Sequence, residues 1–323
     1  MRFLYFCVYV SITTYKIFMI TIYQAIFLGL FQGVSELFPI SSLGHSVIIP
    51  PLLGWNINES DNFFLFFLVA THFATSLALL TFFYKDWVGI IKGFLVSCRL
   101  GGRSLKDFDN HTRSNIRLAW VIIAGTIPAG ILGLLLQTKI QHLFASPRTA
   151  AIFLIVNGIM LWTIELKMRA HHIATIASDK APQEKALQEQ THSDERISRL
   201  TWGKAIRVGL AQAIALIPGF SRTGATIGGG FMVGLSREDA ARFSFLLATP
   251  IIFAAAVLKL PQLFSYLHTG GGAVLAPLIV GFIASFIAAF FSVRFLVKYF
   301  KTETLMPFAV YCMIIGVAAT ILL

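Results

Sequence analysis

Long apolar runs separated by short polar segments set the pattern of this chain. A helix needs about 20 mostly apolar residues to cross the hydrocarbon core of a bilayer. Six runs approach or reach that length, at 63–84, 118–137, 149–166, 243–260, 276–297 and 305–323. The pattern predicts an all-α polytopic membrane protein with six transmembrane helices.

Two further apolar stretches, 20–50 and 205–234, are interrupted near their middle by proline, glycine and polar residues. At membrane depth, the backbone groups freed by such a break must be shielded by protein or line a water-filled cavity. We therefore predict two re-entrant helix-loop-helix elements. Their tips read FPISSLGHSV at 38–47 and PGFSRTGATIGGG at 218–230.

The composition agrees with a membrane protein, because 56% of the 323 residues are hydrophobic and 13% are charged, against about 25% charged in soluble domains. The net charge of +11 could suggest a nucleic-acid partner, but the basic residues gather between apolar runs. Loops 85–117 and 167–207 and segment 294–301 are rich in lysine and arginine, whereas 138–148 and 261–275 are not. The positive-inside rule makes the first three cytoplasmic, which puts the first tip on the external side and the second on the internal side.

The two interrupted stretches resemble each other at an offset of 180 residues. Three spans follow each of them, and because three is odd the two halves must have opposite orientations, as in an inverted-topology repeat. We expect a first repeat at 19–170, a flexible polar cytoplasmic linker at 171–204 and a second repeat at 205–323. Residues 1–18 are expected to be an N-terminal extension, with Met19 as an alternative start. The matching residues are Ala25, Ile26, Gly29, Leu30, Gln32, Ser41 and Gly44 with Ala205, Ile206, Gly209, Leu210, Gln212, Ser221 and Gly224.

The second tip has the residues of an anion site. Ser221, Arg222, Thr223 and Thr226 lie among glycines, where a helix is expected to restart. Glycine allows the backbone to approach a ligand closely, and N–H groups at a helix start favour an anion. The guanidinium of Arg222 adds a planar donor fork suited to phosphate. The alternative is a structural salt bridge between Arg222 and Glu36.

The first tip supplies complementary groups. Gln32 and Glu36 are four residues apart, so they project from the same face of a helix. A buried carboxylate there can act as a general base, a metal ligand or the counter-charge of Arg222. Ser42 and His45 follow the break, and a hydroxyl near an imidazole and a carboxylate is typical of an activated nucleophile. In the next span, His72 and Thr75 either line the same cavity or hydrogen-bond between helices.

The motifs QGVSELFPISSLGH and PGFSRTGATIGGG together resemble the bacterial undecaprenyl-pyrophosphate phosphatases, also called bacitracin-resistance proteins, over residues 19–323. The resemblance implies hydrolysis of the terminal phosphate of a C55 prenyl pyrophosphate, which recycles the lipid carrier of cell-envelope synthesis. It also implies a Mg²⁺ or Ca²⁺ requirement, a bacterial inner-membrane location with the site open to the external side, and often a homodimer. The matching catalytic residues are Glu36, Ser42, His45 and Arg222, with Glu36 also a metal ligand. Substrate-binding residues are Gln32, Ser41, Gly219, Ser221, Thr223 and Thr226.

The sequence departs from the family pattern at three places. Gln32 stands where glutamate is common, so Glu36 must be the base and metal ligation at position 32 becomes weaker. Leu43 and Thr223 replace the more usual threonine and serine, and neither change removes a reactive group. Two other functions stay open, since inverted repeats with broken helices are also typical of secondary transporters or lipid flippases, and Arg222 alone would suit an anion channel.

Overall fold

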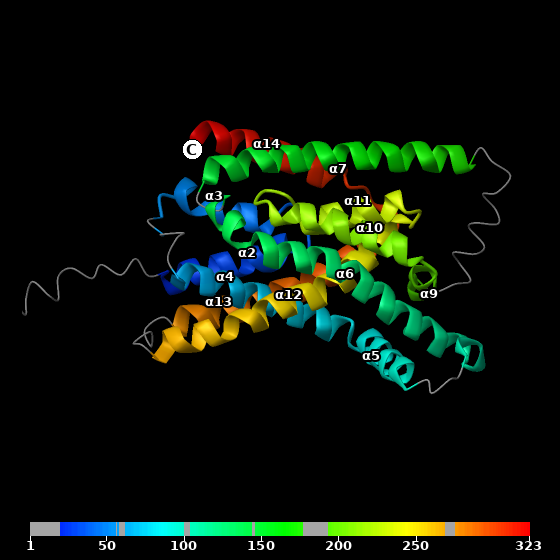
Figure 1. The fold of residues 1–323 in the computed structure, drawn as a ribbon. Helices are drawn as coiled ribbons and strands as arrows, with labels where there is room; N and C mark the ends of the chain where they lie inside the picture. Colours follow the sequence, from blue (N-terminus) through cyan, green and yellow to red (C-terminus); the bar gives the residue numbers. More distant parts are fainter. Residues whose placement is uncertain are drawn as a thin grey trace, which may run out of the picture.

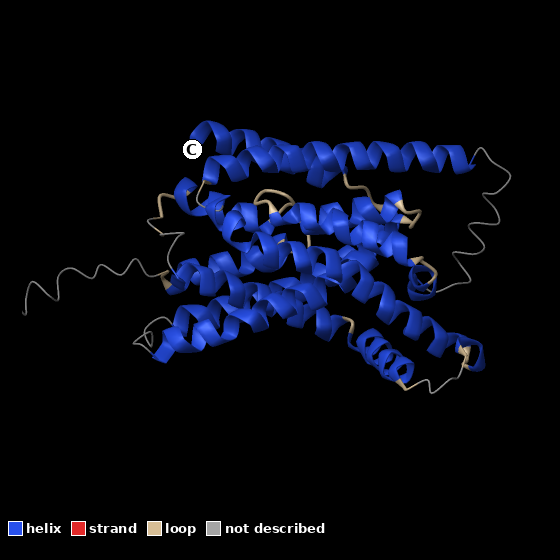
Figure 2. Cartoon of the chain, viewed as in Figure 1, coloured by secondary structure: helices blue, strands red, loops and turns tan. Residues whose placement is uncertain are grey.

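The computed structural model describes residues 20–55, 57, 62–99, 104–143, 146–176, 193–268 and 275–323, with the backbone alone described for 137–143 and 172–176. Every regular element in these ranges is a helix (Figure 2). The α-helices are α2 (Ile22–Ser35), α3 (Ser42–Leu52), α4 (Asn62–Phe82), α5 (Tyr84–Cys98), α6 (Asn110–Leu143), α7 (Pro147–Ile176), α9 (Ser193–Ser198), α10 (Trp202–Ala213), α11 (Arg222–Met232), α12 (Arg237–His268), α13 (Leu275–Thr302) and α14 (Met306–Leu322). Two short 3₁₀ helices, η1 (Leu105–Asp107) and η2 (Ile214–Leu216), complete the described elements.

Five of these helices are long and apolar enough to cross a membrane, namely α4, α6, α7, α12 and α13. Each overlaps one of the predicted spans. The remaining predicted span, 305–323, corresponds to α14, an apolar helix of 17 residues. The chain is therefore a multi-pass membrane protein, and all regular elements of its described residues are helices. The predicted extension at 1–18 lies outside the described residues.

Both interrupted stretches form a helix that ends and then restarts. The first break separates α2 from α3 at residues 36–41, and the second separates η2 from α11 at residues 217–221. Pro39 and Pro218 lie in these breaks, where a residue without a backbone N–H costs no helical hydrogen bond. Each restart has the same cap: the Ser41 hydroxyl accepts a hydrogen bond from Gly44 N, and the Ser221 hydroxyl accepts one from Gly224 N, both at 3.2 Å.

Small residues allow two pairs of helices to pack with their backbones close together. A Cβ atom on Gly29 of α2 would lie 2.4 Å from the carbonyl oxygen of Gly281 in α13, and one on Gly209 of α10 would lie 2.2 Å from that of Gly125 in α6. Since a real Cβ does not come so close, α2 and α10 each require glycine at this place. Small residues commonly allow such close packing between membrane helices.

Helices α7 and α14 run side by side along one edge of the molecule (Figure 1). A Cβ on Gly158 of α7 would lie 2.8 Å from Ala309 O of α14, and a Cβ on Gly316 of α14 would lie 2.9 Å from Ala151 O of α7. Each helix therefore contributes one glycine to the contact, and each glycine lies against an alanine carbonyl of the other helix.

The stretch predicted as a flexible linker is helical at both of its described ends. Helix α7 continues to Ile176, and α9 begins at Ser193. Ion pairs dock α9 on α12: Arg196 Nε lies 2.7 Å from Asp239 Oδ2, and Arg242 Nε lies 2.6 Å from Asp194 Oδ1. These pairs explain why a short polar segment is helical, since α9 is too short to be stable alone.

A second ionic contact joins α7 to the ends of other helices. The Glu165 carboxylate of α7 is fully buried and accepts hydrogen bonds from Arg169 at 2.9 Å and from Arg237 at 3.0 Å. It also accepts one from the backbone N–H of Leu305 at 3.0 Å. This carboxylate thus connects α7 with the beginnings of α12 and α14, away from the two tips.

Candidate active site

The two tips, far apart in the sequence, are in direct contact. Arg222 Nη2 donates to Glu36 Oε1 at 2.7 Å, and the Thr223 hydroxyl donates to the backbone oxygen of Glu36 at 3.1 Å. The backbones also approach closely, because a Cβ on Gly44 would lie 2.9 Å from Gly219 Cα. The structure therefore joins the carboxylate of the first tip to the guanidinium of the second.

The buried Glu36 carboxylate is the centre of the site. Besides Arg222 on Oε1, its Oε2 atom accepts hydrogen bonds from the Ser42 hydroxyl and from Gln32 Nε2, the latter at 2.9 Å. His72 Nε2 lies 3.2 Å from the same oxygen. A hydroxyl held on a carboxylate oxygen is the arrangement by which a base removes the proton of a nucleophile.

Two helix N-termini meet at this carboxylate. Ser42 is the first residue of α3 and Arg222 is the first residue of α11. The first turn of a helix has free N–H groups and carries the positive end of the helix dipole, so it favours an anion. Arg222 adds a full positive charge, and its Nη1 atom, although buried, has no hydrogen-bond partner among the described residues. The arrangement is suited to a phosphate group that would occupy this unused donor.

His45 lies next to the cluster but not in it. Its Nδ1 is 2.7 Å from the carbonyl oxygen of Ser41, and its Nε2 is 3.1 Å from the Tyr311 hydroxyl. The ring is packed between Phe31 and Tyr311, with ring centroids 5.1 and 5.6 Å away. Both ring nitrogens thus have partners, and neither of these is Ser42 or Glu36. The histidine that contacts Glu36 is His72.

The contact of His45 with Ser41 helps to hold an unusual backbone conformation at Ser41. Ser41 has φ +66°, in a region that residues other than glycine rarely adopt, and such a conformation persists only where the surroundings hold it. The His45 contact to the Ser41 carbonyl and the cap from Gly44 N to the Ser41 hydroxyl fix this residue from both sides. They therefore determine where the following residue, Ser42, lies.

The remaining predicted binding residues support the second tip from within. The Thr226 hydroxyl donates to Arg222 O at 2.8 Å and contacts the Ser244 hydroxyl of α12. Gly219 has φ +99°, and a Cβ there would lie 2.4 Å from Ala150 O of α7. Glycine is thus required at 219 both by the backbone conformation and by the close approach to α7.

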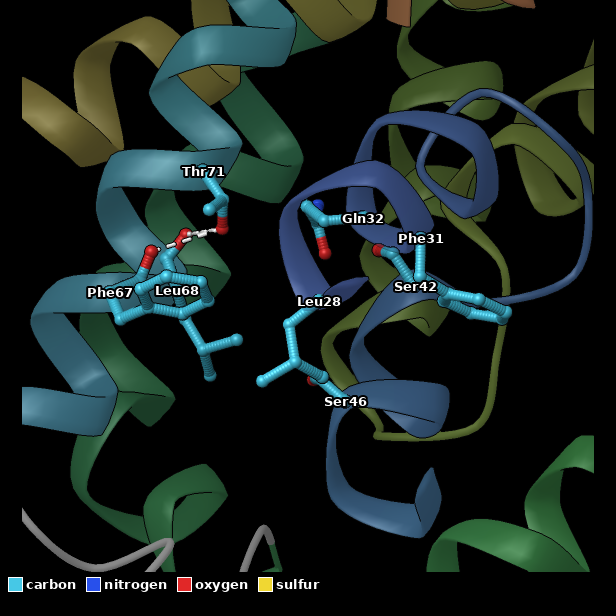
Figure 3. A pocket seen from close by; sticks show the side chains of 8 residues that line it. All are labelled: Leu28, Phe31, Gln32, Ser42, Ser46, Phe67, Leu68 and Thr71. Carbon is cyan, nitrogen blue, oxygen red and sulfur yellow. Dashed lines mark hydrogen bonds between the residues drawn. The ribbon is translucent and has the colours of Figure 1, made fainter. Parts of the chain in front are cut away.

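A small pocket opens beside Ser42, with Gln32 and Ser42 on one side and α4 on the other (Figure 3). Its volume is about 10 Å³, close to the room that one water molecule needs. The Oε1 atom of Gln32 is buried and has no hydrogen-bond partner within the described residues. The pocket therefore combines a free oxygen ligand and a hydroxyl with an apolar wall. Its lining residues are Leu28, Phe31, Gln32, Ser42, Ser46, Phe67, Leu68 and Thr71.

Two residues of the site were not among the predicted site residues. His72 lies in the apolar span α4, and sequence reasoning left it open between cavity lining and helix packing. Asn157 is fully buried in α7 and contacts both tips, with Nδ2 3.1 Å from Pro39 O and Oδ1 2.9 Å from Ser221 N. The available signal was a polar side chain in the middle of a transmembrane run, which is costly there and usually has a partner.

Comparisons with known proteins agree on one family. The family model described as bacitracin resistance protein BacA matches residues 25–318. A protein of Mycolicibacterium paratuberculosis named undecaprenyl-diphosphatase is 45% identical over 309 residues, which cover 92% of this chain and 96% of the relative. Proteins named undecaprenyl-diphosphatase 2 from Chromobacterium violaceum and Burkholderia orbicola are 42% and 44% identical, with 91% and 90% of this chain and 96% and 93% of the relatives covered.

Proposed function

The chain belongs to the family of the bacitracin resistance protein BacA, and from this premise we propose that it is an undecaprenyl-diphosphatase. It hydrolyses undecaprenyl pyrophosphate to undecaprenyl phosphate and inorganic phosphate, and so contributes to bacitracin resistance. The observation that carries the proposal is the contact of Ser42 and Arg222 with one buried carboxylate, Glu36. These three groups are a nucleophile, an anion-binding group and a base at hydrogen-bond distance.

In the proposed reaction, the diphosphate lies between the first turns of α3 and α11. Arg222 binds the phosphate oxygens through its fork and stabilises the charge that develops on them. The Ser42 oxygen, or a water molecule in its place, attacks the terminal phosphorus, and its proton passes to Glu36. The bond between that phosphorus and the bridging oxygen breaks, which releases undecaprenyl phosphate. If Ser42 attacks, water then hydrolyses the phosphoserine.

The apolar wall of the pocket is suited to the lipid part of this substrate. Leu28 of α2 and Phe67 and Leu68 of α4 line the same pocket as the Ser42 hydroxyl (Figure 3). The first isoprene units can contact these side chains while the rest of the tail stays in lipid.

A divalent cation is part of the proposal. Among the described residues there is no group of three or more histidine, cysteine, aspartate or glutamate side chains that could hold a metal ion. The carboxylate of Glu36 and the free Oε1 of Gln32 are nevertheless the oxygen ligands that Mg²⁺ and Ca²⁺ prefer, and Mg²⁺ often takes its other ligands from substrate phosphates. A bound cation would neutralise charge on the phosphate oxygens.

We propose that the chain is built as an inverted repeat with six spans and two re-entrant elements, joined by the segment between α7 and α10. The equivalent glycine contacts of α2 on α13 and α10 on α6 support this, as do the reciprocal contacts of α7 and α14. The basic segments support an inner-membrane orientation with the site toward the external side. Whether two copies associate as a homodimer is part of the same proposal and rests on the family alone.

Phosphate release by the purified protein in detergent tests the proposed phosphatase activity. The wild type should release phosphate from undecaprenyl pyrophosphate, whereas Arg222→Ala and Glu36→Ala should not. Arg199→Ala is the matched control, because Arg199 forms an exposed ion pair with Glu195 at 2.9 Å outside the site. Near-normal turnover of either site variant would contradict the proposal. Transport of a prenyl phosphate across liposomes without phosphate release would instead favour a lipid flippase or secondary transporter.

A further inference from the structure

Asn157 joins the two tips through a single side-chain amide. It lies in α7 and is fully buried. Its Nδ2 group donates to the carbonyl oxygen of Pro39 in the first tip at 3.1 Å, and its Oδ1 atom accepts from the backbone N–H of Ser221 in the second tip at 2.9 Å. The side-chain amide thus donates a hydrogen bond to one tip and accepts one from the other, as a backbone peptide group would.

The backbone groups that Asn157 contacts are close in sequence to the reactive side chains. Ser221 directly precedes Arg222, and Pro39 lies three residues before Ser42. The second tip also rests on the same helix, since Gly219 approaches Ala150 of α7. Helix α7 therefore provides a common support to which both tips are attached.

One other contact between the tips, the ion pair of Arg222 with Glu36, depends on groups that take part in the reaction. That ion pair weakens when the carboxylate takes a proton, although the diphosphate can use the free Nη1 donor of Arg222. The bonds of Asn157 go to backbone atoms, so they can persist while the site is occupied. At that moment the spacing between the nucleophile and the anion-binding group depends on Asn157 and on the bond from the Thr223 hydroxyl to Glu36 O.

We propose that Asn157 is a positioning residue, which keeps the Ser42 tip and the Arg222 tip in register while the diphosphate lies between them. This rests on the proposed function of the site. An amide is needed because one donor and one acceptor are used at once. Aspartate has the same shape, but it has no donor and would place a carboxylate oxygen against Pro39 O.

The test compares Asn157→Asp and Asn157→Ala with a matched control, Cys312→Ala. The control removes the third contact of the amide, from Nδ2 to Cys312 Sγ at 3.3 Å, and the long contact from Cys312 Sγ to Pro39 O at 3.9 Å, but it leaves both bonds of Asn157 to the tips. Phosphate release per folded molecule is measured well below the thermal midpoint of each variant. Because misplacement of reacting groups by about 1 Å can cost 100-fold in rate, kcat should fall about 100-fold in both Asn157 variants. KM should change by less than about threefold, since Arg222 still binds the phosphate, and Cys312→Ala should resemble the wild type.

Three results would overturn the inference. The first is a wild-type kcat in a folded Asn157 variant. The second is an equal loss in Cys312→Ala, because the effect would then pass through the cysteine contact. The third is that neither Asn157 variant folds, which would make the residue a requirement of the fold. A wild-type protein that releases no phosphate would instead refute the proposed function, so the two failures are distinguishable.

Discussion

Replacing Glu36 by glutamine is the most informative single change at the proposed site. The carboxylate accepts one hydrogen bond on Oε1, from Arg222, and its Oε2 contacts three possible donors, Ser42, Gln32 and His72. Glutamine has one oxygen and one donating amide group. Its best orientation keeps the oxygen toward the three donors and turns the amide toward Arg222, so the bond to the guanidinium is lost.

The size of the effect follows from these contacts. Loss of a hydrogen bond to a charged group costs about 1.5–3 kcal/mol, and breaking a buried ion pair by removing one partner costs about 3–5 kcal/mol. The variant should therefore unfold at a lower temperature. Loss of a general base slows a reaction by about 10²–10⁴-fold, so kcat should fall at least about 100-fold, equivalent to about 2.7 kcal/mol. KM should not rise, because Arg222 is released to bind phosphate.

The assay is phosphate release from undecaprenyl pyrophosphate in detergent, with kcat and KM fitted separately and thermal unfolding measured on the same samples. Glu195→Gln is the matched control, since Glu195 pairs with Arg199 at 2.9 Å, close to the 2.7 Å between Glu36 and Arg222, but both side chains of the control pair are more than 40% exposed. Such a pair contributes about 0–1 kcal/mol. A Glu36→Gln variant with unchanged kcat and a raised KM would show that Glu36 contributes equally to binding of the substrate and of the transition state. This result would refute the assignment of Glu36 as the base.

Three other changes test separate parts of the structure. Glu165→Gln should lower the thermal midpoint without changing turnover per folded molecule, because this buried carboxylate joins helix ends away from the tips. Gly29→Ala should destabilise by about 1–3 kcal/mol and lower kcat, since its Cβ would displace α2 from Gly281, whereas Gly203→Ala, with open space around the Cβ, should do neither. Burial raises the pKa of the Asp86 carboxyl. Asp86→Asn should therefore gain thermal stability relative to the wild type as pH rises from about 4 to 7, because ionising Asp86 then costs more in the folded protein than in the unfolded chain.

The proposed cation is tested by its removal. EDTA should abolish phosphate release by the wild type, and excess Mg²⁺ or Ca²⁺ should restore it. Gln32→Glu should increase the affinity for the cation, because it adds a second carboxylate beside Glu36. Full activity in EDTA would contradict a metal requirement, and an unchanged cation dependence in Gln32→Glu would argue against Gln32 Oε1 as a ligand.

The helical fold and the positions of both breaks could be predicted from the sequence for a simple reason. Apolar runs of membrane length form helices because the backbone must satisfy its own hydrogen bonds in lipid. Proline and glycine mark where a helix is interrupted, as at Pro39 and Pro218. The offset of 180 residues also matched Gly29 with Gly209, which are the residues of the two close helix contacts. Hydropathy, the positions of proline and glycine, and the repeat can all be identified directly from the order of the residues.

The partners of polar residues inside the spans could not be predicted in this way. Hydropathy does not say which face of a helix meets which neighbour, so His72 was left without a partner although it contacts Glu36. His45 was expected to act with Ser42 and Glu36 because it lies in the first tip, opposite the arginine of the second, but its Nε2 contacts Tyr311, which lies 266 residues away. Asn157 joins segments 118 and 64 residues away. Such contacts depend on how helices pack laterally, which a single sequence does not encode in an obvious pattern.

The two serine caps bear on how a two-part site could evolve by gene duplication. The Ser41 and Ser221 hydroxyls accept equivalent cap hydrogen bonds, both at 3.2 Å, and the next residue is Ser42 in one tip and Arg222 in the other. A duplicated segment would begin with identical residues at both places, each already presented at a helix start. One substitution after either cap would then give the two copies different chemistry, and the backbones of the caps have also diverged, since Ser41 has φ +66° and Ser221 has φ −86°. The separate roles of nucleophile and anion-binding residue would thus need few substitutions. Exchanging the residues that follow the two caps would give variants that resemble such an ancestor.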